Sequence, residues 1–431
     1  MSTPLIHRPA SELARLIRDR TVSAAEVMDS HLMAVERLNP QLNAIVAIAD
    51  DARDQAAAHD RALARGERLG PLHGVPFTVK DIIETAGLPT TLGMVALADN
   101  RSDRDATVVA RMRSSGAILL GKTNCPPGGS GGATENKLHG RTLNPYDPQR
   151  SPGGSSGGEA AAIATGMSPC GIGSDSGGSL RMPAHFCGIA TLKPTAGRIP
   201  LTGILDVDGP LGPMRDPRTQ PGPMARSMED IATLLAILAG PDGVDGGVAP
   251  VPLRDPTGIE LVGARVMLHR SDGVSLPDVG TDAALRDAAA ALREAGAVIS
   301  EDAPPPGGQE LTQRVWDSYG DEMTASELYT VLGDWDGYRT AMLSLLDRFD
   351  LILAPVAPGP APMHGGDVVW RYTTPHSLTG WPCAVVRAGT SAGMPVGVQV
   401  IAGPWRDQLA IAAAAAIETG RGGWLPPADP G

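Results

Sequence analysis

Two clusters of small residues, placed on either side of an apolar segment, constrain this chain more than any other feature. GGSSGG occupies Gly153–Gly158 and SDSGGS occupies Ser174–Ser179, both within a stretch that runs from Ser151 to Thr195. The intervening apolar segment, Ala160–Met167, predicts a buried helix. Glycine loses more backbone entropy on folding than any other residue, so such clusters indicate tight turns or backbone N–H groups that approach a ligand closely. N–H groups gathered in this way can hold an oxyanion.

Glycine- and serine-rich sequence is also typical of flexible linkers, which gives a second interpretation of the two clusters. Here the clusters bracket an apolar segment and continue into CGIATL at Cys187–Leu192, which predicts a strand. A linker would not be interleaved with core elements. We therefore expect the whole stretch to be buried, with its glycines and serines at the turns.

The motifs of this stretch and of its surroundings resemble those of the amidase signature family, the Ser-cisSer-Lys amide hydrolases. The resemblance is most specific in Ser151–Thr195 and continues upstream through GVPFTVKD at Gly74–Asp81, LGKTN at Leu120–Asn124 and TENKLHGRTLNPYDPQRSPGGSSGG at Thr134–Gly158. Weaker matches follow downstream at Gly222–Leu235, Leu351–Pro358, Ser377–Val386 and Met394–Asp407. With these segments the resemblance covers nearly the whole chain.

The resemblance implies an active site, position by position. Ser179 matches the nucleophile, Ser155 matches the bridging serine, whose preceding peptide bond is cis in the family, and Lys80 matches the base. The implied oxyanion hole consists of the backbone N–H groups of Ser176, Gly177, Gly178 and Ser179, and the implied supporting residues are Ser156, Asp175 and Arg181. A serine hydroxyl is a weak nucleophile that needs a base in contact, and burial can lower the pKa of a lysine enough for it to act as one.

Lys80 can also be judged from the residues around it. The segment HGVPFTVKD alternates like a buried strand that ends at Lys80, although an exposed strand end is the common place for such a lysine. The chain has only four lysines, Lys80, Lys122, Lys137 and Lys193, and uses arginine elsewhere. A retained lysine therefore points weakly to a need for an amine that can become neutral.

Two other sequence patterns match known functional motifs but lack the neighbouring helix or strand that those motifs require. GAILLGKT at Gly116–Thr123 fits the P-loop spacing, but its centre predicts a strand over Ile118–Leu120, and prolines block the helix that should follow. The pattern G-x-S-x-G occurs at Ser130, Ser155 and Ser156 without the preceding apolar strand that an α/β-hydrolase elbow requires. A serine–lysine mechanism must therefore be assembled from distant parts of the chain.

The composition of the chain argues against several classes of partner and cofactor. The net charge is −12 without a basic run, which argues against nucleic-acid binding. No apolar run of membrane-spanning length and no leader at the N-terminus is seen, so we expect no membrane span and a cytoplasmic protein. The cysteines and histidines lack metal-ligand spacing, so we predict no metal and no cofactor, and we expect the four cysteines to be buried free thiols.

The resemblance implies an α/β class fold in which one compact α/β/α unit surrounds a large, twisted, mixed sheet. We treat 1–431 as a single amidase domain with an N-terminal helical region (1–70), a signature core (71–240) and a C-terminal part (241–431) that completes the sheet and pocket. The N-terminal helices are predicted at Pro9–Arg20, Ser23–Leu38 and Asp50–Arg65, and a Gly/Pro-rich connection at Gly203–Pro223. Further predicted elements are a strand at Ala44–Ala47, helices at Ser227–Ala239, Thr281–Ala295 and Gln408–Thr419, and strands at Arg265–Leu268, Ala297–Ser300, Leu351–Pro355, Ala384–Arg387 and Val396–Ile401.

Two segments bear on the substrate pocket. Leu311–Leu346 is predicted to be helical and carries aromatic residues that form either core or a pocket wall: Trp316, Tyr319, Tyr329, Trp335 and Tyr338. Where many relatives carry bulky residues near the reacting acyl group, this chain has CPPGGSGG. Its glycines, Gly128, Gly129, Gly131 and Gly132, predict a more open or more mobile pocket, so no relative's substrate is carried over.

The sequence leaves two enzyme functions open. We expect an amidase that hydrolyses the C–N bond of a small-molecule carboxamide through an acyl-serine, with possible side activity on esters or carbamates. The alternative is the glutaminase subunit of a tRNA-dependent amidotransferase complex. A binding protein without activity is disfavoured because Lys80, Ser155 and Ser179 are all present. A homodimer is also possible.

Overall fold

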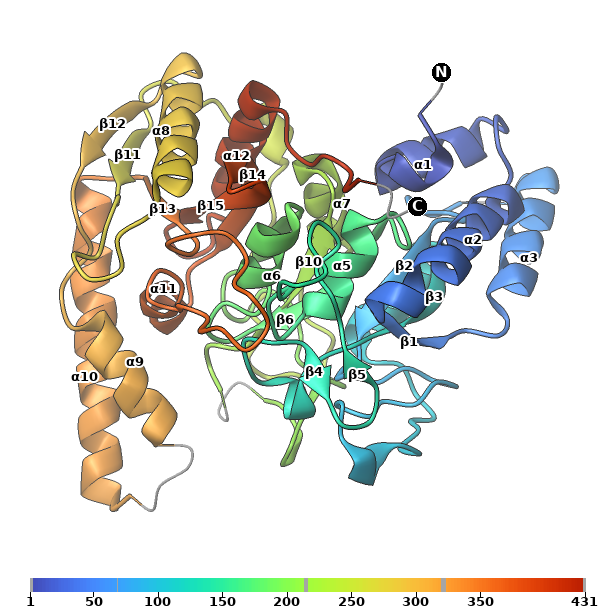
Figure 1. Cartoon of the computed structure of the whole chain (residues 1–431), viewed down its shortest axis with the longest axis horizontal. Coiled ribbons are helices and arrows are strands. Elements are labelled where there is room, and N and C mark those ends of the chain that lie inside the picture. The colour runs from blue at the N-terminus through green and yellow to red at the C-terminus, as the bar shows by residue number, and fades with distance from the viewer. Residues whose placement is uncertain (1–2, 68, 213–215, 319–322, 429–431) are drawn as a thin grey trace.

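A mixed sheet crosses the whole molecule in the computed structural model, which describes residues 3–67, 69–212, 216–318 and 323–428 (Figure 1). Its strands lie in the order β1 (Ile45–Ile48), β3 (Ile118–Thr123), β2 (Pro76–Lys80), β6 (Cys170–Asp175), β10 (Gln220–Ala225), β7 (Ala190–Lys193), β14 (Cys383–Ser391), β15 (Met394–Ala402), β13 (Leu351–Pro355), β11 (Arg265–Leu268) and β12 (Val298–Glu301). The predicted α/β class, with one large mixed sheet covered by helices, is confirmed.

The pairing of the strands decides where polar residues meet. β2 pairs in parallel with β3 and with β6, whereas β10 pairs antiparallel with both β6 and β7. In the β2–β6 register Val79 lies opposite Ile172. Because parallel strands end at the same edge of a sheet, Lys80 and Ser174 emerge side by side there.

Both faces of the sheet are covered by helices, as the alternation along β14 shows. Ala384 and Val386 pack in the same apolar cluster as α7 (Met228–Leu238), α8 (Val279–Glu294) and α12 (Asp407–Arg421). Val385, between them, packs in the cluster that holds α5 (Gly157–Ala164) and α6 (Arg181–Cys187). Successive strand residues point to opposite faces, so the two groups of helices lie on opposite sides.

The remaining elements surround this core (Figure 1). α10 stands with α9 at the edge of the molecule that β11 and β12 form, and α1 and α2 lie toward the opposite edge. The remaining helices are α1 (Ala10–Arg18), α2 (Ala24–Leu42), α3 (Ala52–Ala64), α4 (Thr107–Ser114), α9 (Gly308–Asp317), α10 (Ala325–Leu343) and α11 (Thr374–Thr379). Two short hairpins, β4–β5 (Glu135–Asn136, Gly140–Arg141) and β8–β9 (Leu205–Asp206, Gly209–Pro210), and the 3₁₀ turns η1 (Leu5–His7), η2 (Val95–Leu97), η3 (Pro127–Gly129), η4 (Pro256–Gly258) and η5 (Ser344–Asp347) complete the described part.

Two predictions about elements are wrong. Cys187–Leu192 is not one strand, because Cys187 ends α6, Gly188 adopts a left-handed φ of 64° and β7 starts at Ala190. The connection predicted at Gly203–Pro223 contains the start of β10, which pairs with β6. The helical prediction for Leu311–Leu346 is confirmed, and the structure adds that the segment holds two helices: α9 ends at Asp317, and α10 begins after the Thr324 N-cap, whose capping box with Glu327 is complete.

Several local predictions are confirmed. The helix predicted from Ser23 does begin there, because Ser23 and Glu26 form a complete capping box at the start of α2. The P-loop-like segment lies in β3, as its apolar centre predicts. The cysteines are buried and none is in a disulfide: Cys125, Cys170, Cys187 and Cys383. Among the described helices, none has the length and apolarity needed to cross a membrane.

Candidate active site

Lys80 lies at the carboxyl end of β2 and is fully buried. Its Nζ lies 2.5 Å from Ser155 Oγ and 2.9 Å from Ser174 Oγ, with the Gly129 carbonyl oxygen 3.4 Å away. Burial lowers the pKa of Lys80 to about 8, because a buried ammonium loses its hydration. The side chain is therefore neutral in roughly one molecule in ten at pH 7. The prediction of a buried strand end is confirmed.

The loop before α5 brings Ser155 to this amine and Ser156 to the second cluster. The peptide bond between Gly154 and Ser155 is cis, as the family resemblance implies. The Ser156 backbone N–H donates to the Ser179 carbonyl oxygen at 3.2 Å, and Ser156 Oγ lies 3.3 Å from both the backbone N and the carbonyl O of Ser174. Ser156 therefore links the two clusters that are separate in the sequence.

The second cluster forms the turn from β6 into α6, called the oxyanion loop below (residues 176–179) after the role that the resemblance implies for it. Within the described residues, no protein group accepts a hydrogen bond from the backbone N–H groups of this loop. Gly178 has a φ of 142°, and a Cβ there would lie 2.6 Å from Thr373 Oγ1. That hydroxyl donates to the Gly177 carbonyl oxygen at 2.6 Å, so α11 holds the loop from behind. Only glycine allows this close approach.

Asp175 and Arg181 form a buried ion pair across the oxyanion loop, with Arg181 Nη2 3.0 Å from Asp175 Oδ1. Burial acts to raise the pKa of Asp175, but the Arg181 guanidinium outweighs it and holds this pKa below its ordinary value. Asp175 Oδ2 also accepts from the Leu180 backbone N–H, and Arg181 donates to the Thr373 carbonyl oxygen at 2.9 Å. The pair thus fixes both ends of the loop against α11.

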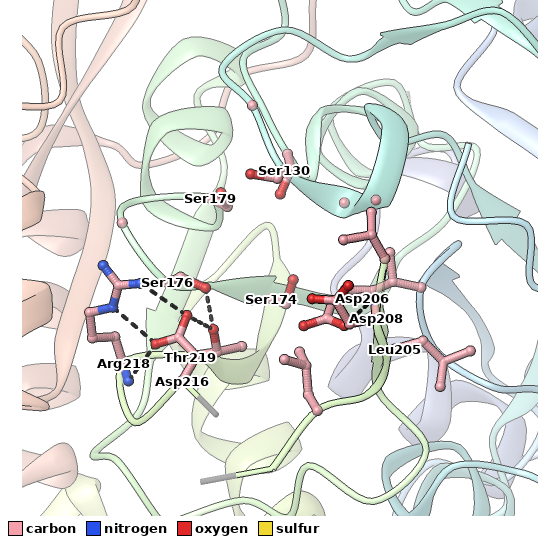
Figure 2. Close-up of a pocket in the computed structure, with 18 of the residues that line it drawn as sticks. Ser130, Ser174, Ser176, Ser179, Leu205, Asp206, Asp208, Asp216, Arg218 and Thr219 are labelled. Carbon is pink, nitrogen blue, oxygen red and sulfur yellow. Dashed lines mark hydrogen bonds and ion pairs between the residues drawn. The ribbon is translucent and has the colours of Figure 1, made fainter. Parts of the chain in front are cut away.

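A cavity of about 810 Å³ opens onto these groups (Figure 2). Ser179 and Ser176 are partly exposed, and both line the cavity together with Ser130, as Figure 2 shows. Ser176 Oγ hydrogen-bonds to Thr219, which donates to Asp216 at 2.8 Å, and Asp216 pairs with Arg218. The cavity is lined by Ile82, Gly128, Gly129, Ser130, Gly131, Ser155, Ser174, Ser176, Gly177, Ser179, Leu205, Asp206, Val207, Asp208, Leu211, Asp216, Arg218, Thr219, Trp316 and Trp370.

The structure brings together the three catalytic residues that the resemblance implies, but one expected hydrogen bond among these described residues is absent. Lys80 contacts Ser155 directly, and Ser155 and Ser179 line the same cavity. The Ser179 hydroxyl has no hydrogen-bond partner in the described part of the chain, so its contact with the Ser155 hydroxyl is not made here. Apo catalytic hydrogen bonds are often long or absent and tighten when substrate binds.

Some site residues were not anticipated. Ser174, which lies against Lys80, is the first serine of SDSGGS, and the parallel pairing of β2 with β6 that brings them together has no local signal. The hairpin β8–β9 supplies a wall of the cavity from a segment that the sequence predicts only as a connection. No group of three or more possible metal ligands occurs in the described ranges.

The aromatic residues of α9 and α10 divide between the two predicted roles. Trp335 and Tyr338 are buried in the core, whereas Trp316 lines the cavity. Tyr329 is 76% exposed and belongs to neither class, and Tyr319 lies outside the described residues.

The glycines after Pro127 form part of the cavity wall, as expected of an open pocket. Gly128, Gly129 and Gly131 line it, while a Cβ on Gly132 would meet Val368 at 2.9 Å and Trp370 at 3.0 Å. Gly132 is therefore packed and does not widen the cavity.

Comparison with known proteins identifies the family of this chain. The sequence model of the amidase family matches residues 26–317 and 320–411. The chain is 34% identical to an indoleacetamide hydrolase of Bradyrhizobium diazoefficiens, over 97% of this chain and 87% of that protein. It is 32% identical to a subunit of the glutamyl-tRNA(Gln) amidotransferase of Chloroflexus aurantiacus, over 94% of this chain and 95% of that protein.

Its fold is similar to that of a solved structure, the native peptide amidase of Stenotrophomonas maltophilia. The TM-score is 0.87 at 27% identity, and the match covers 98% of this chain and 99% of the other. Family match and fold agree along the chain. This protein belongs to the amidase family and is an amidase, a hydrolase of C–N bonds.

Proposed function

We propose that this amidase cleaves small-molecule carboxamides through an acyl-serine intermediate on Ser179, with Lys80 as the base and Ser155 as the proton relay. The observation that carries this proposal is the contact of 2.5 Å between the buried Lys80 amine and Ser155 Oγ, at a cavity to which Ser179 is exposed. A serine hydroxyl becomes an effective nucleophile only when a base removes its proton.

Acylation begins with attack of Ser179 Oγ on the amide carbonyl carbon. The Ser179 proton passes to Ser155 Oγ while the Ser155 proton passes to the neutral Lys80 amine. The oxyanion is stabilised by the N–H groups of the oxyanion loop, which have no other acceptor in the described part of the chain. Collapse of the intermediate breaks the C–N bond, and the proton returns from Lys80 through Ser155 to the leaving amine.

Deacylation repeats the route with water. Water attacks the acyl-serine carbonyl carbon, gives one proton to Lys80 through Ser155, and the acyl–oxygen bond breaks as Ser179 regains its proton. The products are a carboxylic acid and an amine, and the enzyme returns to its starting state. An ester enters the same route with an alcohol as leaving group, which supports side activity on esters or carbamates.

A free-standing amidase and a glutaminase subunit would share this chemistry, and the chain is similar to both kinds of protein. The cavity wall favours the free-standing enzyme, because its glycines, Gly128, Gly129 and Gly131, leave the pocket open to amides other than glutamine. The wall is also substantially apolar, with Ile82, Leu205 and Leu211 among its residues.

The test is amide hydrolysis by the purified chain without partners. Release of ammonia or amine is measured for a panel of primary and secondary amides, with glutamine included, beside the Ser179→Ala variant. We expect turnover of non-glutamine amides and a loss of several orders of magnitude in Ser179→Ala, since removing the nucleophile leaves only binding and electrostatic catalysis. Activity on glutamine alone, and only after partner subunits are added, would support the amidotransferase alternative.

A further inference from the structure

Aromatic residues are scarce in this chain, yet two of them line the cavity. Aromatic residues make up 3% of the sequence, with six tryptophans among 431 residues. Trp316 on α9 and Trp370 before α11 both belong to the cavity wall. They come from segments that are distant in the sequence, so the fold itself gathers them at the site.

Both indole rings lie against the oxyanion loop. A Cβ added to Gly177 would lie 3.0 Å from Trp316 Cζ2, and one added to Gly178 would lie 3.1 Å from Trp370 Cε3. Trp370 Cζ2 also lies 3.0 Å from the position of a Cβ on Gly132. The tryptophans are therefore neighbours of the two glycines that precede Ser179.

The segments that carry the two rings are tied together and to the loop. The Trp370 carbonyl oxygen accepts from the Thr373 and Thr374 N–H groups at 2.9 and 3.0 Å, and the Thr373 hydroxyl donates to Gly177. On α9, Gln309 Nε2 donates to the Arg371 carbonyl oxygen. These contacts hold the two segments that carry the rings in place, so little backbone freedom of these segments would be lost on binding a ligand.

The indoles also keep accessible surface. Trp316 is 36% exposed although it lines a cavity, and Trp370 is partly exposed while one side packs on the cluster around α5 and α6. Exposed indole surface beside a reactive serine is surface that a substrate can cover. A cavity of about 810 Å³ has room for an amide that carries a ring.

We propose that Trp316 and Trp370 form an aryl-recognition site and that the preferred substrates are carboxamides with an aromatic ring on the acyl side. The proposal rests on the function proposed above, because it takes Ser155 as the proton donor to the leaving amine. That role places the amine beside Ser155 and Lys80, which leaves the acyl substituent to extend along the oxyanion loop toward the two indoles. Stacked or edge-to-face contact with an indole then favours an aromatic ring over a saturated one.

The test compares three amides of similar size. Phenylacetamide carries an aromatic ring on the acyl side, cyclohexylacetamide carries a saturated ring there, and N-benzylacetamide carries an aromatic ring on the amine side. The readout is the ratio of kcat/KM for phenylacetamide to that for each of the others. Each tryptophan is replaced by Leu, which stays apolar, and by Phe, which keeps a ring. Tyr329→Ala is the control, because Tyr329 is an exposed aromatic residue on α10 that does not line the cavity.

We expect the wild-type enzyme and Tyr329→Ala to prefer phenylacetamide. Trp316→Leu and Trp370→Leu should each lower the phenylacetamide-to-cyclohexylacetamide ratio about 3- to 10-fold, as the loss of one aromatic pair implies, and the Phe variants should restore most of it. Equal ratios in wild type and both Leu variants, or a preference for N-benzylacetamide that the tryptophans control, would overturn the proposal.

A binding measurement tests the aryl-recognition site independently of the proposed catalytic mechanism. Phenylacetamide is titrated into Ser179→Ala and into the double variants Ser179→Ala/Trp316→Leu and Ser179→Ala/Trp370→Leu, with heat of binding as the readout. Weaker binding by the double variants supports the aryl site even if wild type hydrolyses no amide. Hydrolysis of all three substrates without a tryptophan effect on rate or binding would leave the amidase mechanism standing and refute the aryl site.

Discussion

Two buried lysines lie at the ends of neighbouring strands and differ in their surroundings. Lys122 Nζ lies 3.6 Å from an Asp81 carboxylate oxygen and 2.9 Å from Thr90 Oγ1, so its charge is compensated. Lys80 is surrounded by serine hydroxyls and a carbonyl oxygen, and no carboxylate in the described ranges lies within ion-pair distance of it. Burial lowers the pKa of both lysines, but the neighbouring Asp81 carboxylate acts to raise the pKa of Lys122, whereas Lys80 has no such neighbour within ion-pair distance among the described residues. A lowered pKa is what a general base requires of a lysine.

The pH dependence of activity follows from Lys80. Its pKa is lowered to about 8, and only the neutral amine accepts a proton, so kcat/KM should rise about tenfold per pH unit below 8 and level off above it. Lys80→Arg keeps the charge but cannot be neutral, so we expect it to be inactive across the profile. The measurement is a pH–rate profile of both proteins, with circular dichroism to verify folding.

The exposed Lys137→Arg is the control for the substitution itself and should retain wild-type activity, since its side chain faces solvent. If Lys80→Arg kept more than a small fraction of wild-type activity, Lys80 would not be the base.

At the scale of residues, specific motifs in the sequence predict most of the candidate site, whereas the local pattern of apolar and polar residues predicts little of it. Ser155, Ser179 and Lys80 are predicted to be catalytic because their motifs are specific, and Lys80 proves to be buried in contact with Ser155. Ser174 carries no signal of its own, because only the pairing of β2 with β6 shows that it reaches the lysine. The catalytic roles themselves remain predictions until they are measured.

At the scale of elements, the first turn of α5 holds a buried carboxyl group against two strands. Glu159 accepts from Thr78 on β2 and from Thr123 Oγ1 on β3, the latter at 2.8 Å. Burial raises the pKa of Glu159 to about 8, although the two hydroxyls act to lower it. The group is therefore predominantly protonated at neutral pH.

A raised folded-state pKa makes stability depend on pH. At a pH below the ordinary carboxyl pKa, Glu159 is protonated in both the folded and the unfolded protein. As the pH rises toward 8, Glu159 loses its proton first in the unfolded protein. The free energy of unfolding therefore falls by up to about 1.4 kcal/mol per pH unit in this range. Glu159→Gln removes this titration. Between pH 5 and 8 the free energy of unfolding of the variant, from urea denaturation, should therefore rise relative to that of wild type.

The exposed Glu36→Gln serves as the control and should run parallel to wild type over the same range. A Glu159→Gln curve that also ran parallel would show that Glu159 is ionised in the folded protein.

The elements that the sequence misses share a physical reason. β10 holds Pro221 and Pro223, and prolines indicate a connection in the sequence. β7 pairs only with Met224 and Ala225 of β10, so the part of β10 that holds the prolines has β6 as its single neighbouring strand in the described structure. Prolines are tolerated there as they are in an edge strand. α6 is buried on every side, so no apolar periodicity marks it as a helix. Local pattern fails where the surroundings decide burial.

At the scale of the molecule, the sheet joins segments from both halves of the chain. β7 in the signature core pairs with β14, which comes from the C-terminal part, at Leu192 and Ala384 among other positions. The N-terminal region is attached as well, because the Asp230 carboxylate on α7 accepts from the Ala10 and Ser11 N–H groups at 2.8 Å. The sequence predicts these strands but not their order, since pairing between distant strands has no local signal.

This continuity supports the prediction that 1–431 is a single domain. We expect one unfolding transition in calorimetry, with the calorimetric enthalpy equal to the van't Hoff enthalpy, since neither half can lose its strands without exposing the other. Fluorescence and circular dichroism should give the same midpoint. Two separable transitions, one of which leaves the 241–431 part folded, would contradict it.

The central claim is that the acyl group is carried by Ser179, and trapping the acyl-enzyme tests it most directly. The protein is mixed with p-nitrophenyl butyrate, quenched in acid within the first turnovers and examined by intact-mass and peptide mass spectrometry, with heat-denatured protein as the control for adventitious acylation. The account predicts one butyryl group, on the peptide that contains Ser179, in wild type and none there in Ser179→Ala. A butyryl group on any other residue of the native enzyme, or equal acylation of Ser179→Ala, would contradict it.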